Sequence, residues 1–171
     1  EGDVFWDIGA NVGTYGLMAA SRGDLQVWCF EPETANYHRL LQNIGLNPEL
    51  KVACAQVAFS DKTGDGFLNV LHGGKAGAAN NHLSDEGQEV EVYRMDDWRR
   101  IGVHDQPDHV KLQVVRGGVE TLQACKTVMI EIEHEDEGLE EIRAVFAGFG
   151  ETMFYRSGTA YSHRFVRSTD G

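Results

Sequence analysis

Residues 4–13, Val4-Phe5-Trp6-Asp7-Ile8-Gly9-Ala10-Asn11-Val12-Gly13, decide the fold of this chain. Their first half, residues 4–8, is a short and mostly apolar run of the kind that forms a buried strand, and it ends at Gly9. The spacing of apolar residues then predicts a helix over about residues 12–22, with Gly23 just beyond its end. A buried strand that passes through a glycine turn into a helix is the first half of a strand–helix–strand unit.

The alternation of strand and helix patterns continues through the first third of the chain. A second strand is predicted at residues 26–31, where Pro32 ends it, and a third at residues 52–59. Between them, apolar residues at helical spacing predict an amphipathic helix over residues 34–44. Strands that alternate with helices in this way pair in parallel through right-handed crossovers, which predicts the layered α/β class.

The rest of the chain carries weaker patterns of the same two kinds. It contains no internal repeat and no linker, so a single domain over residues 1–171 is expected. The remaining predictions are a turn at 61–66, a loop at 73–81, helices at about 95–101, 119–124 and 139–148, and strands at 67–70, 89–93, 110–114, 128–132, 152–155 and 161–166.

Composition and charge exclude several classes of protein. Subtracting 27 Asp and Glu from 15 Lys and Arg leaves a net charge of −12, which would repel nucleic acid and anionic membranes, so neither is expected as a partner. No apolar stretch approaches the roughly 18–20 residues of a membrane span. Three cysteines are too few for a disulfide framework and predict a reduced, cytoplasmic compartment. Because the chain begins at Glu1 without a methionine, we expect a piece of a longer protein that lacks its N-terminal part.

A ligand site is expected at the carboxyl end of the first strand, because open parallel sheets bind ligands where the strand order reverses. This end carries a Gly-x-Asn-x-Gly turn. Gly9 permits a tight turn, Gly13 permits close packing of the helix, and Asn11 is the non-glycine residue type that best tolerates a positive φ. The alternative is that this turn only connects a strand to a helix.

Glu31 is the second candidate, at the end of the second strand and 22 positions beyond Gly9. A carboxylate about 20 residues after such a turn can accept both hydroxyls of a ribose. The alternative is an acid that stabilises the start of the next helix through the helix dipole. Asp7 lies just ahead of the turn, where its carboxylate would repel a pyrophosphate but suit a cationic sulfonium nucleoside. These residues favour S-adenosylmethionine over NAD.

Ser60 and Asp61 follow the third predicted strand. Asp61 could accept a hydrogen bond from an adenine amino group that lies across the first three strand ends, or it could be an ordinary turn residue. No metal site is expected, because the run from His134 to Glu137 has the pattern of a solvated surface, whereas a hard cation needs several convergent oxygens.

With these residues the chain resembles the FkbM-type S-adenosylmethionine-dependent methyltransferases, from residue 4 to about residue 149. The resemblance rests on residues 4–13, on Phe30-Glu31-Pro32 with Tyr37, Leu40, Asn43 and Leu46-Asn47, on Ala58-Phe59-Ser60-Asp61 with Gly64, and on residues 128–132. It implies a Rossmann-like class I methyltransferase fold, with seven strands in a mostly parallel sheet and helices on both faces. It also implies S-adenosylmethionine as the cofactor, with its ribose on Glu31 and its methionine part beside Asp7, Gly9, Asn11 and Gly13. Members typically methylate hydroxyl groups, so the implied partner is a small-molecule or sugar hydroxyl acceptor.

One stretch departs from the family pattern. Family members usually carry Lys-Ile-Asp-Val-Glu-Gly at the fourth strand, whereas here residues 110–114 run straight into residues 115–122, with Gln113 in place of the family's Asp. We expect that a segment between Val114 and Val115 is either deleted or missing from the sequence. A true deletion would favour a non-catalytic methyltransferase-like domain that serves in binding or regulation.

A hydroxyl acceptor also needs a base, and histidine is the side chain best tuned for this near neutral pH. His82 and His134 are the candidates, because both are predicted in segments that overhang the sheet, but a plain surface or capping role is the commoner one for such histidines. We leave the base unassigned. The sequence therefore favours a methyltransferase, with the non-catalytic domain second and a nicotinamide-dependent oxidoreductase, which Asp7 and Asn11 oppose, third.

Overall fold

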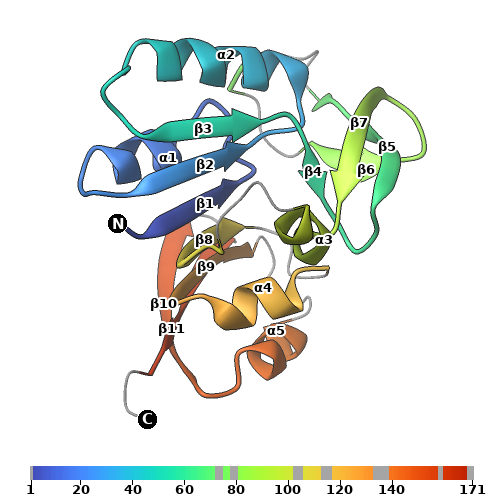
Figure 1. The fold of residues 1–171 in the computed structure, drawn as a ribbon. Helices are drawn as coiled ribbons and strands as arrows, with labels where there is room; N and C mark the ends of the chain where they lie inside the picture. The colour runs from blue at the N-terminus through green and yellow to red at the C-terminus, as the bar shows by residue number, and fades with distance from the viewer. Residues whose placement is uncertain are drawn as a thin grey trace.

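A seven-stranded sheet forms the centre of the molecule (Figure 1). The computed structural model describes residues 2–71, 75–77, 81–101, 106–112, 117–132, 139–157 and 160–168. The strands, from one edge of the sheet to the other, are β10 (Phe149–Ser157), β11 (Ala160–Arg167), β9 (Thr127–Ile132), β8 (His109–Leu112), β1 (Val4–Ile8), β2 (Gln26–Phe30) and β3 (Val52–Ala55). Strand β11 runs antiparallel to β9 and β10, and the other neighbours pair in parallel, which confirms the predicted mostly parallel sheet.

The strand order reverses between β1 and β8. From β1 the chain moves outward to β2 and β3, and it then returns to the other side of β1 to form β8. In this arrangement Asp7 of β1 lies between Cys29 of β2 and Lys111 of β8. Figure 1 shows the arrowheads of β1, β2 and β3 pointing to the same edge of the sheet. This carboxyl edge is where an open α/β sheet binds its ligands.

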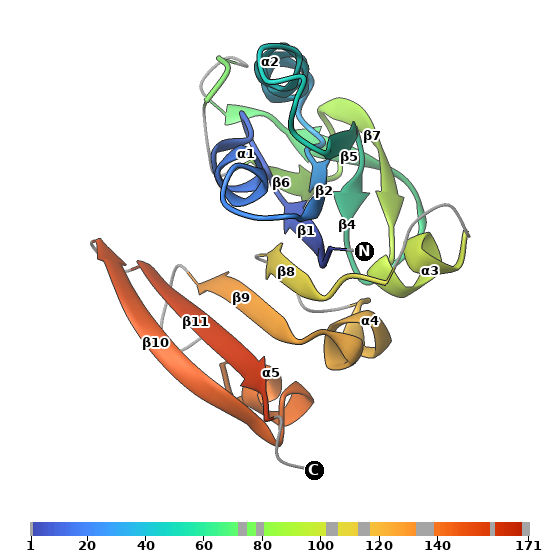
Figure 2. The ribbon, with the colours of Figure 1, turned by 60° about the vertical axis from the view of Figure 1, so that its left-hand side comes forward.

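Helices cover both faces of the sheet, as predicted. Side chains alternate between the faces of a strand, so Cys29 packs with helices on one face and Trp6 with helices on the other. Figure 2 shows the two groups on opposite sides of the sheet. The first group is α1 (Thr14–Ala20) and α2 (Thr34–Gly45), and the second is α3 (Met95–Arg100), α4 (Val119–Ala124) and α5 (Leu139–Val145).

A second, four-stranded sheet lies beyond the carboxyl edge of β3 (Figure 1). Its order is β4 (Ala58–Phe59), β7 (Gln88–Tyr93), β5 (Gly64–Asn69) and β6 (His82–Ser84). An aromatic cluster joins the two sheets, because the ring of Phe59 lies 5.0 Å from that of Phe30 and 6.4 Å from that of Trp6. Phe59 therefore belongs to the hydrophobic core of the main sheet, while the second sheet also has a separate buried cluster of its own.

The second sheet corrects two predictions. Residues 52–59 are not one strand, because β2 ends where Phe30 pairs with Ala55, and beyond that point the chain has no partner in the first sheet. Ala58 and Phe59 pair with β7 instead. Residues 64–66, predicted as part of a turn, belong to β5, and residues 82–84, for which no element was predicted, form the short strand β6.

Two further observations concern the chain as a whole. Among the described helices, none combines the length and the apolar character that a membrane span requires. The three cysteines are free thiols, of which Cys29 and Cys125 are buried, and burial raises the pKa of the Cys125 thiol to about 12. These two cysteines act as small packing residues.

Candidate cofactor and active site

The glycine turn after β1 has the backbone that the sequence predicts. Gly9, Asn11 and Gly13 have φ values of 69°, 55° and 91°, and in the described residues Asn11 is the one non-glycine with a positive φ. A Cβ atom on Gly13 would lie 2.6 Å from Leu40 of α2, which confirms the close packing expected there. A Cβ atom on Gly9 would meet nothing within 4 Å. The turn is therefore held on the α2 side and open at Gly9.

Glu31 ties this turn to the start of α2. Its side chain is buried, and its two carboxylate oxygens accept hydrogen bonds from Asn11 N at 2.7 Å and from Glu33 N at 3.0 Å. Burial raises the pKa of the Glu31 carboxyl above its ordinary value. The two backbone hydrogen bonds oppose this shift only in part. The oxygen that accepts from Asn11 N has a further lone pair, so the group can still accept a hydroxyl hydrogen from a ligand, whereas the other oxygen also has the amide of Asn36 at 3.5 Å.

The alternative role considered for Glu31 belongs to its neighbour. Glu33 is the N-cap residue of α2, and its carboxylate accepts hydrogen bonds from Ala35 N at 3.0 Å and from Asn36 N at 2.6 Å. The start of the helix therefore already has its own capping acid. Glu31 accepts one backbone N–H at this helix start, from Glu33, and one from Asn11 in the glycine turn.

Asp7 lies inside the protein rather than at the surface of the site. Its side chain is fully buried, one oxygen accepts a hydrogen bond from Gly16 N at 2.9 Å, and the other lies 3.6 Å from the ammonium of Lys111. Burial raises the pKa of Asp7, and the nearby Lys111 opposes this shift. The carboxylate of Asp7 would therefore repel a pyrophosphate less strongly than the sequence alone suggests, because the buried ammonium of Lys111 lies beside it.

Lys111 is a residue of the site that the sequence patterns did not reveal. Its buried ammonium donates to the carbonyl oxygens of Ile8 at 3.3 Å and Gly9 at 3.2 Å, and it lies 3.9 Å from a carboxylate oxygen of Glu131. It also lies over the ring of Tyr15, 5.4 Å from the centroid. A lysine in an otherwise apolar strand needs a buried partner of opposite charge. The position of Lys111 within the predicted strand was therefore the signal that could have identified it.

Ser60 and Asp61 do not follow the third strand of the main sheet, which corrects their expected place. They follow β4, and Ser60 N bonds to the carbonyl of Tyr93 in the second sheet. A Cβ atom on Gly117 would collide with their backbone, so they lie against the segment just before α4. The residue at the carboxyl end of β3 is Gln56, which donates to Pro32 O at 3.3 Å.

Of the two histidine candidates, His82 lies in the second sheet, and His134 is not among the described residues. His82 is an exposed residue at the start of β6, where it pairs with Asn69 of the second sheet. His134, Gln113 and the junction between Val114 and Val115 lie outside the described residues.

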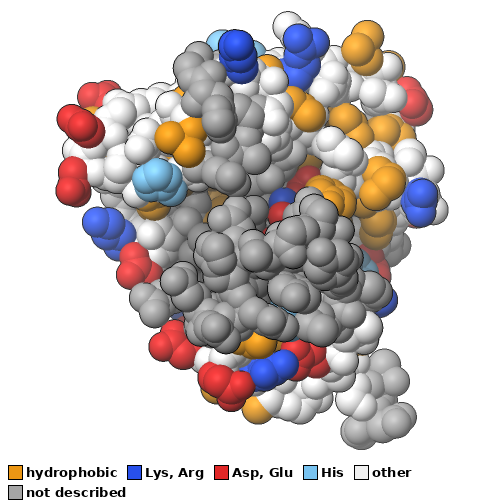
Figure 3. All heavy atoms as spheres, turned by 180° about the vertical axis from the view of Figure 1, so that it is seen from behind, with side chains coloured by type: hydrophobic (Ala, Val, Ile, Leu, Met, Phe, Trp, Pro, Cys, Tyr) orange, Lys and Arg blue, Asp and Glu red, His pale blue; other side chains and the backbone are white. Residues whose placement is uncertain are grey.

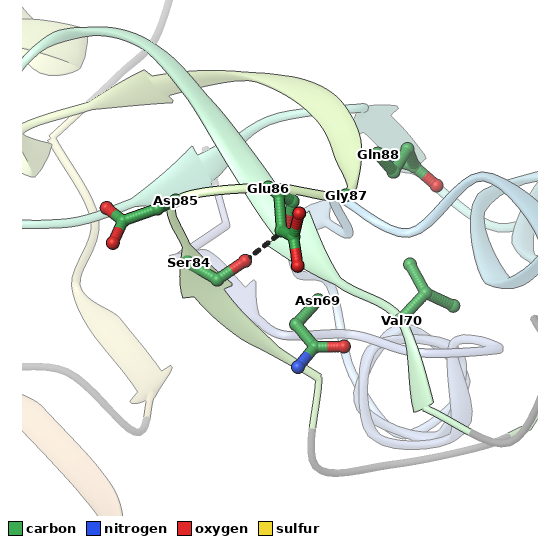
Figure 4. Close-up of a pocket in the computed structure, with 7 residues that line it drawn as sticks. All are labelled: Asn69, Val70, Ser84, Asp85, Glu86, Gly87 and Gln88. Atoms are coloured by element: carbon green, nitrogen blue, oxygen red, sulfur yellow. Dashed lines mark hydrogen bonds between the residues drawn. The ribbon is translucent and has the colours of Figure 1, made fainter.

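A cavity of about 790 Å³ lies in the second sheet (Figure 4). Gln88 is one of its lining residues, and the amide of this side chain also bonds to the backbone of Pro32 and Thr34. Gln88 therefore connects the lining of this cavity to the start of α2. Its lining consists of Asn69, Val70, Ser84, Asp85, Glu86, Gly87 and Gln88.

Comparisons with known proteins agree with this geometry. Hexuronic acid methyltransferase AglP of Haloferax volcanii is 26% identical over 140 residues, which cover 77% of this chain and 56% of that protein. Among solved structures, a precorrin-6y C5,15-methyltransferase from Geobacter metallireducens matches with a TM-score of 0.56 at 12% identity, covering 96% of this chain and 79% of that one. TrmK of M. capricolum, solved with S-adenosyl-homocysteine, matches with a TM-score of 0.56 at 9% identity, covering 96% and 62%. These two likenesses concern the fold, which is that of the class I methyltransferases.

The family follows from the sequence itself. The model of the methyltransferase FkbM domain matches residues 7–156, a range that begins at Asp7 and includes the glycine turn, Glu31 and the strands on both sides of β1. This chain belongs to the FkbM methyltransferase domain family.

Proposed function

We propose that this domain is an S-adenosylmethionine-dependent methyltransferase that acts on a hydroxyl group of a small molecule or sugar. The observation that carries the proposal is the 2.7 Å hydrogen bond from Asn11 N to Glu31, because it sets an acceptor carboxylate beside the glycine turn at the carboxyl edge of the sheet. Family membership and the solved relative with S-adenosyl-homocysteine support the same cofactor.

The residues present fit this cofactor. Glu31 would accept the ribose hydroxyls, and the turn from Gly9 to Gly13 would hold the methionine part on its open side. Beneath the turn, the carboxylates of Asp7 and Glu131 flank the single ammonium of Lys111, which suits a ligand that carries positive charge. When bound, S-adenosylmethionine supplies a methyl group on a sulfonium sulfur.

The chain itself then has to align the reactants and to desolvate them. A displacement at a methyl carbon requires the acceptor oxygen and the leaving sulfur to lie in line, so positioning supplies much of the rate. The rigid turn, fixed by Lys111 below and by Glu31 at its side, is suited to this. A base for the acceptor hydroxyl is not assigned, and His82 and His134 stay candidates.

The proposed acceptor rests on charge and on the relative. The relative that matches is named a hexuronic acid methyltransferase, which supports a sugar hydroxyl. The net charge of −12 opposes nucleic acid and anionic membranes as partners. On the face in Figure 3, the described acidic and basic side chains are mixed around the rim, and they form no continuous basic band among themselves. We propose a cytoplasmic protein that acts on small molecules.

Calorimetric titration tests the cofactor, and a panel of acceptors tests the reaction. We expect S-adenosyl-homocysteine to bind at one site per chain and NAD not to bind. In the presence of S-adenosylmethionine, hydroxyl acceptors including neutral sugars and uronic acids should release S-adenosyl-homocysteine. Cofactor binding without release from any hydroxyl acceptor would favour the non-catalytic domain.

A further inference from the structure

Gln88 joins the second sheet to the cofactor side of the first. It is the first residue of β7, and its half-buried side chain reaches the turn between β2 and α2. The amide nitrogen donates to Pro32 O at 2.8 Å, and the amide oxygen accepts from Thr34 N at 3.0 Å. Figure 4 shows Gln88 apart from the Ser84–Glu86 side of the cavity. One side chain therefore holds both sides of the turn.

The two groups that Gln88 binds need partners from outside the helix. Thr34 is the first residue of α2, so its N–H has no acceptor within the helix. The carboxylate of Glu33 is already used by the next two N–H groups. Pro32 O receives a second, longer bond at 3.3 Å from Gln56. Gln56 also donates to the hydroxyl of Thr34 at 3.0 Å, so two glutamines contact the turn, and it is Gln88 that accepts a hydrogen bond from the backbone N–H of Thr34.

The same turn determines where the Glu31 carboxylate lies. Glu33 N, in the middle of the turn, donates to one oxygen of Glu31 at 3.0 Å. Asn36, one turn further along α2, places its amide 3.5 Å from the same oxygen. A shift of the turn would move both donors and with them the carboxylate.

We propose that Gln88 is a positioning residue for cofactor binding, through which the second sheet sets the carboxylate of Glu31. The inference rests on the proposed function. It gives the second sheet a role in the cofactor site, because the first side chain of β7 fixes the β2–α2 turn although 54 positions separate Gln88 from Thr34. Gln88 acts on the ligand only through Glu31.

The test is the affinity for S-adenosyl-homocysteine of a Gln88→Met variant, which keeps the length of the side chain and removes both hydrogen bonds. We expect binding to weaken about tenfold, the size of effect that one or two neutral hydrogen bonds produce. Gln26→Met is the matched control, because Gln26 is an exposed glutamine at the start of β2, away from the carboxyl edge. Its affinity should equal that of the wild type.

A double-mutant cycle separates positioning from a general loss of structure. If Gln88 acts through Glu31, Gln88→Met should weaken binding much less in a Glu31→Gln background than in the wild type. An undiminished effect in that background, or an unchanged affinity of Gln88→Met itself, overturns the inference. If Gln88→Met does not fold, Gln88→Glu enters the same cycle, because it keeps an oxygen for Thr34 N and loses the donor to Pro32. Failure of the wild type to bind S-adenosyl-homocysteine would instead overturn the proposed function.

Discussion

Two glutamates that lie two positions apart have different roles because their carboxylates point to different donors. Glu33 turns toward the first N–H groups of its own helix. Glu31 turns back toward Asn11 in the glycine turn. The sequence alone left both roles open for Glu31, and the hydrogen bonds of the two carboxylates distinguish the residues.

Replacing Glu31 by alanine should remove cofactor binding. The variant loses hydrogen bonds to a charged acceptor, each of which contributes about 1.5–3 kcal/mol, so the affinity for S-adenosyl-homocysteine should fall more than about 100-fold. Glu33→Ala is the control. It removes a helix cap and should cost about 1 kcal/mol of stability, while the affinity stays within a few fold. Titration calorimetry of both variants checks this, and equal losses in the two would contradict a special role of Glu31.

Lys111 stabilises a part of the core that would otherwise hold only negative charge. In Lys111→Met the buried carboxylate of Asp7 loses its cation, and the carbonyls of Ile8 and Gly9 lose a donor. Breaking a buried ion pair in this way typically costs about 3–5 kcal/mol, so urea unfolding should show a loss of that order. Lys126→Met, which removes an exposed lysine, should change the unfolding free energy little. A loss no larger than that of Lys126→Met would show that Asp7 does not depend on Lys111.

At the scale of elements, a strand or helix was predictable where the spacing of apolar residues within the segment itself indicates its type. The strand at 4–8 and the helix from Thr34 match the structure closely. The strand at 52–59 did not, because its second part pairs with β7, about 30 positions later, and no local pattern records this partner. Local periodicity gives an element its type, whereas its length and its sheet depend on a partner elsewhere in the chain.

The hairpin of β10 and β11 should lose stability at low pH through Glu151. This β10 carboxylate accepts a hydrogen bond from Arg143 of α5 at 2.9 Å and lies 2.7 Å from the ring of the buried His163 in β11. Arg143 first, and then His163, hold the pKa of Glu151 below its ordinary value of 4.5. The stabilisation is therefore present above that value and is lost as the pH falls through the lower pKa of the folded state.

Urea unfolding of a Glu151→Gln variant over a series of pH values measures this contribution. The variant should be less stable than the wild type at pH 7. The difference should vanish at a pH so low that Glu151 of the wild type is protonated in both the folded and the unfolded state. Glu140→Gln is a suitable control, since Glu140 is an exposed partner of the same arginine. A difference that is the same at all pH values would exclude the carboxylate charge as its origin.

At the scale of the molecule, the class of the fold was predictable and the assembly of the site was not. Alternating strands and helices predicted the α/β class, and the glycine turn and Glu31 were placed correctly at the strand ends. Gln56, Gln88 and Lys111 were not found, because each acts on a segment that is distant in sequence. Ser60 and Asp61 were misplaced because the chain leaves the main sheet after Ala55. The second sheet is thus the part that sequence patterns describe least.

Binding at a site that ties β1, β2 and α2 together should stabilise the whole domain. A ligand that binds only the folded state adds RT ln(1 + [L]/Kd), which is about 2.7 kcal/mol at a concentration of 100 Kd. For a domain of this size about 1 kcal/mol corresponds to roughly 2–4 °C, so S-adenosyl-homocysteine at that concentration should raise the Tm by about 5–11 °C. The shift should grow with the logarithm of ligand concentration in a thermal unfolding series. NAD at the same concentrations should give no shift, because it offers a pyrophosphate where two carboxylates and the one ammonium of Lys111 leave a net negative charge beneath the turn. An equal shift with NAD would mean that the edge of the sheet recognises the adenosine part alone, and the assignment to a methyl donor would then lose its structural support.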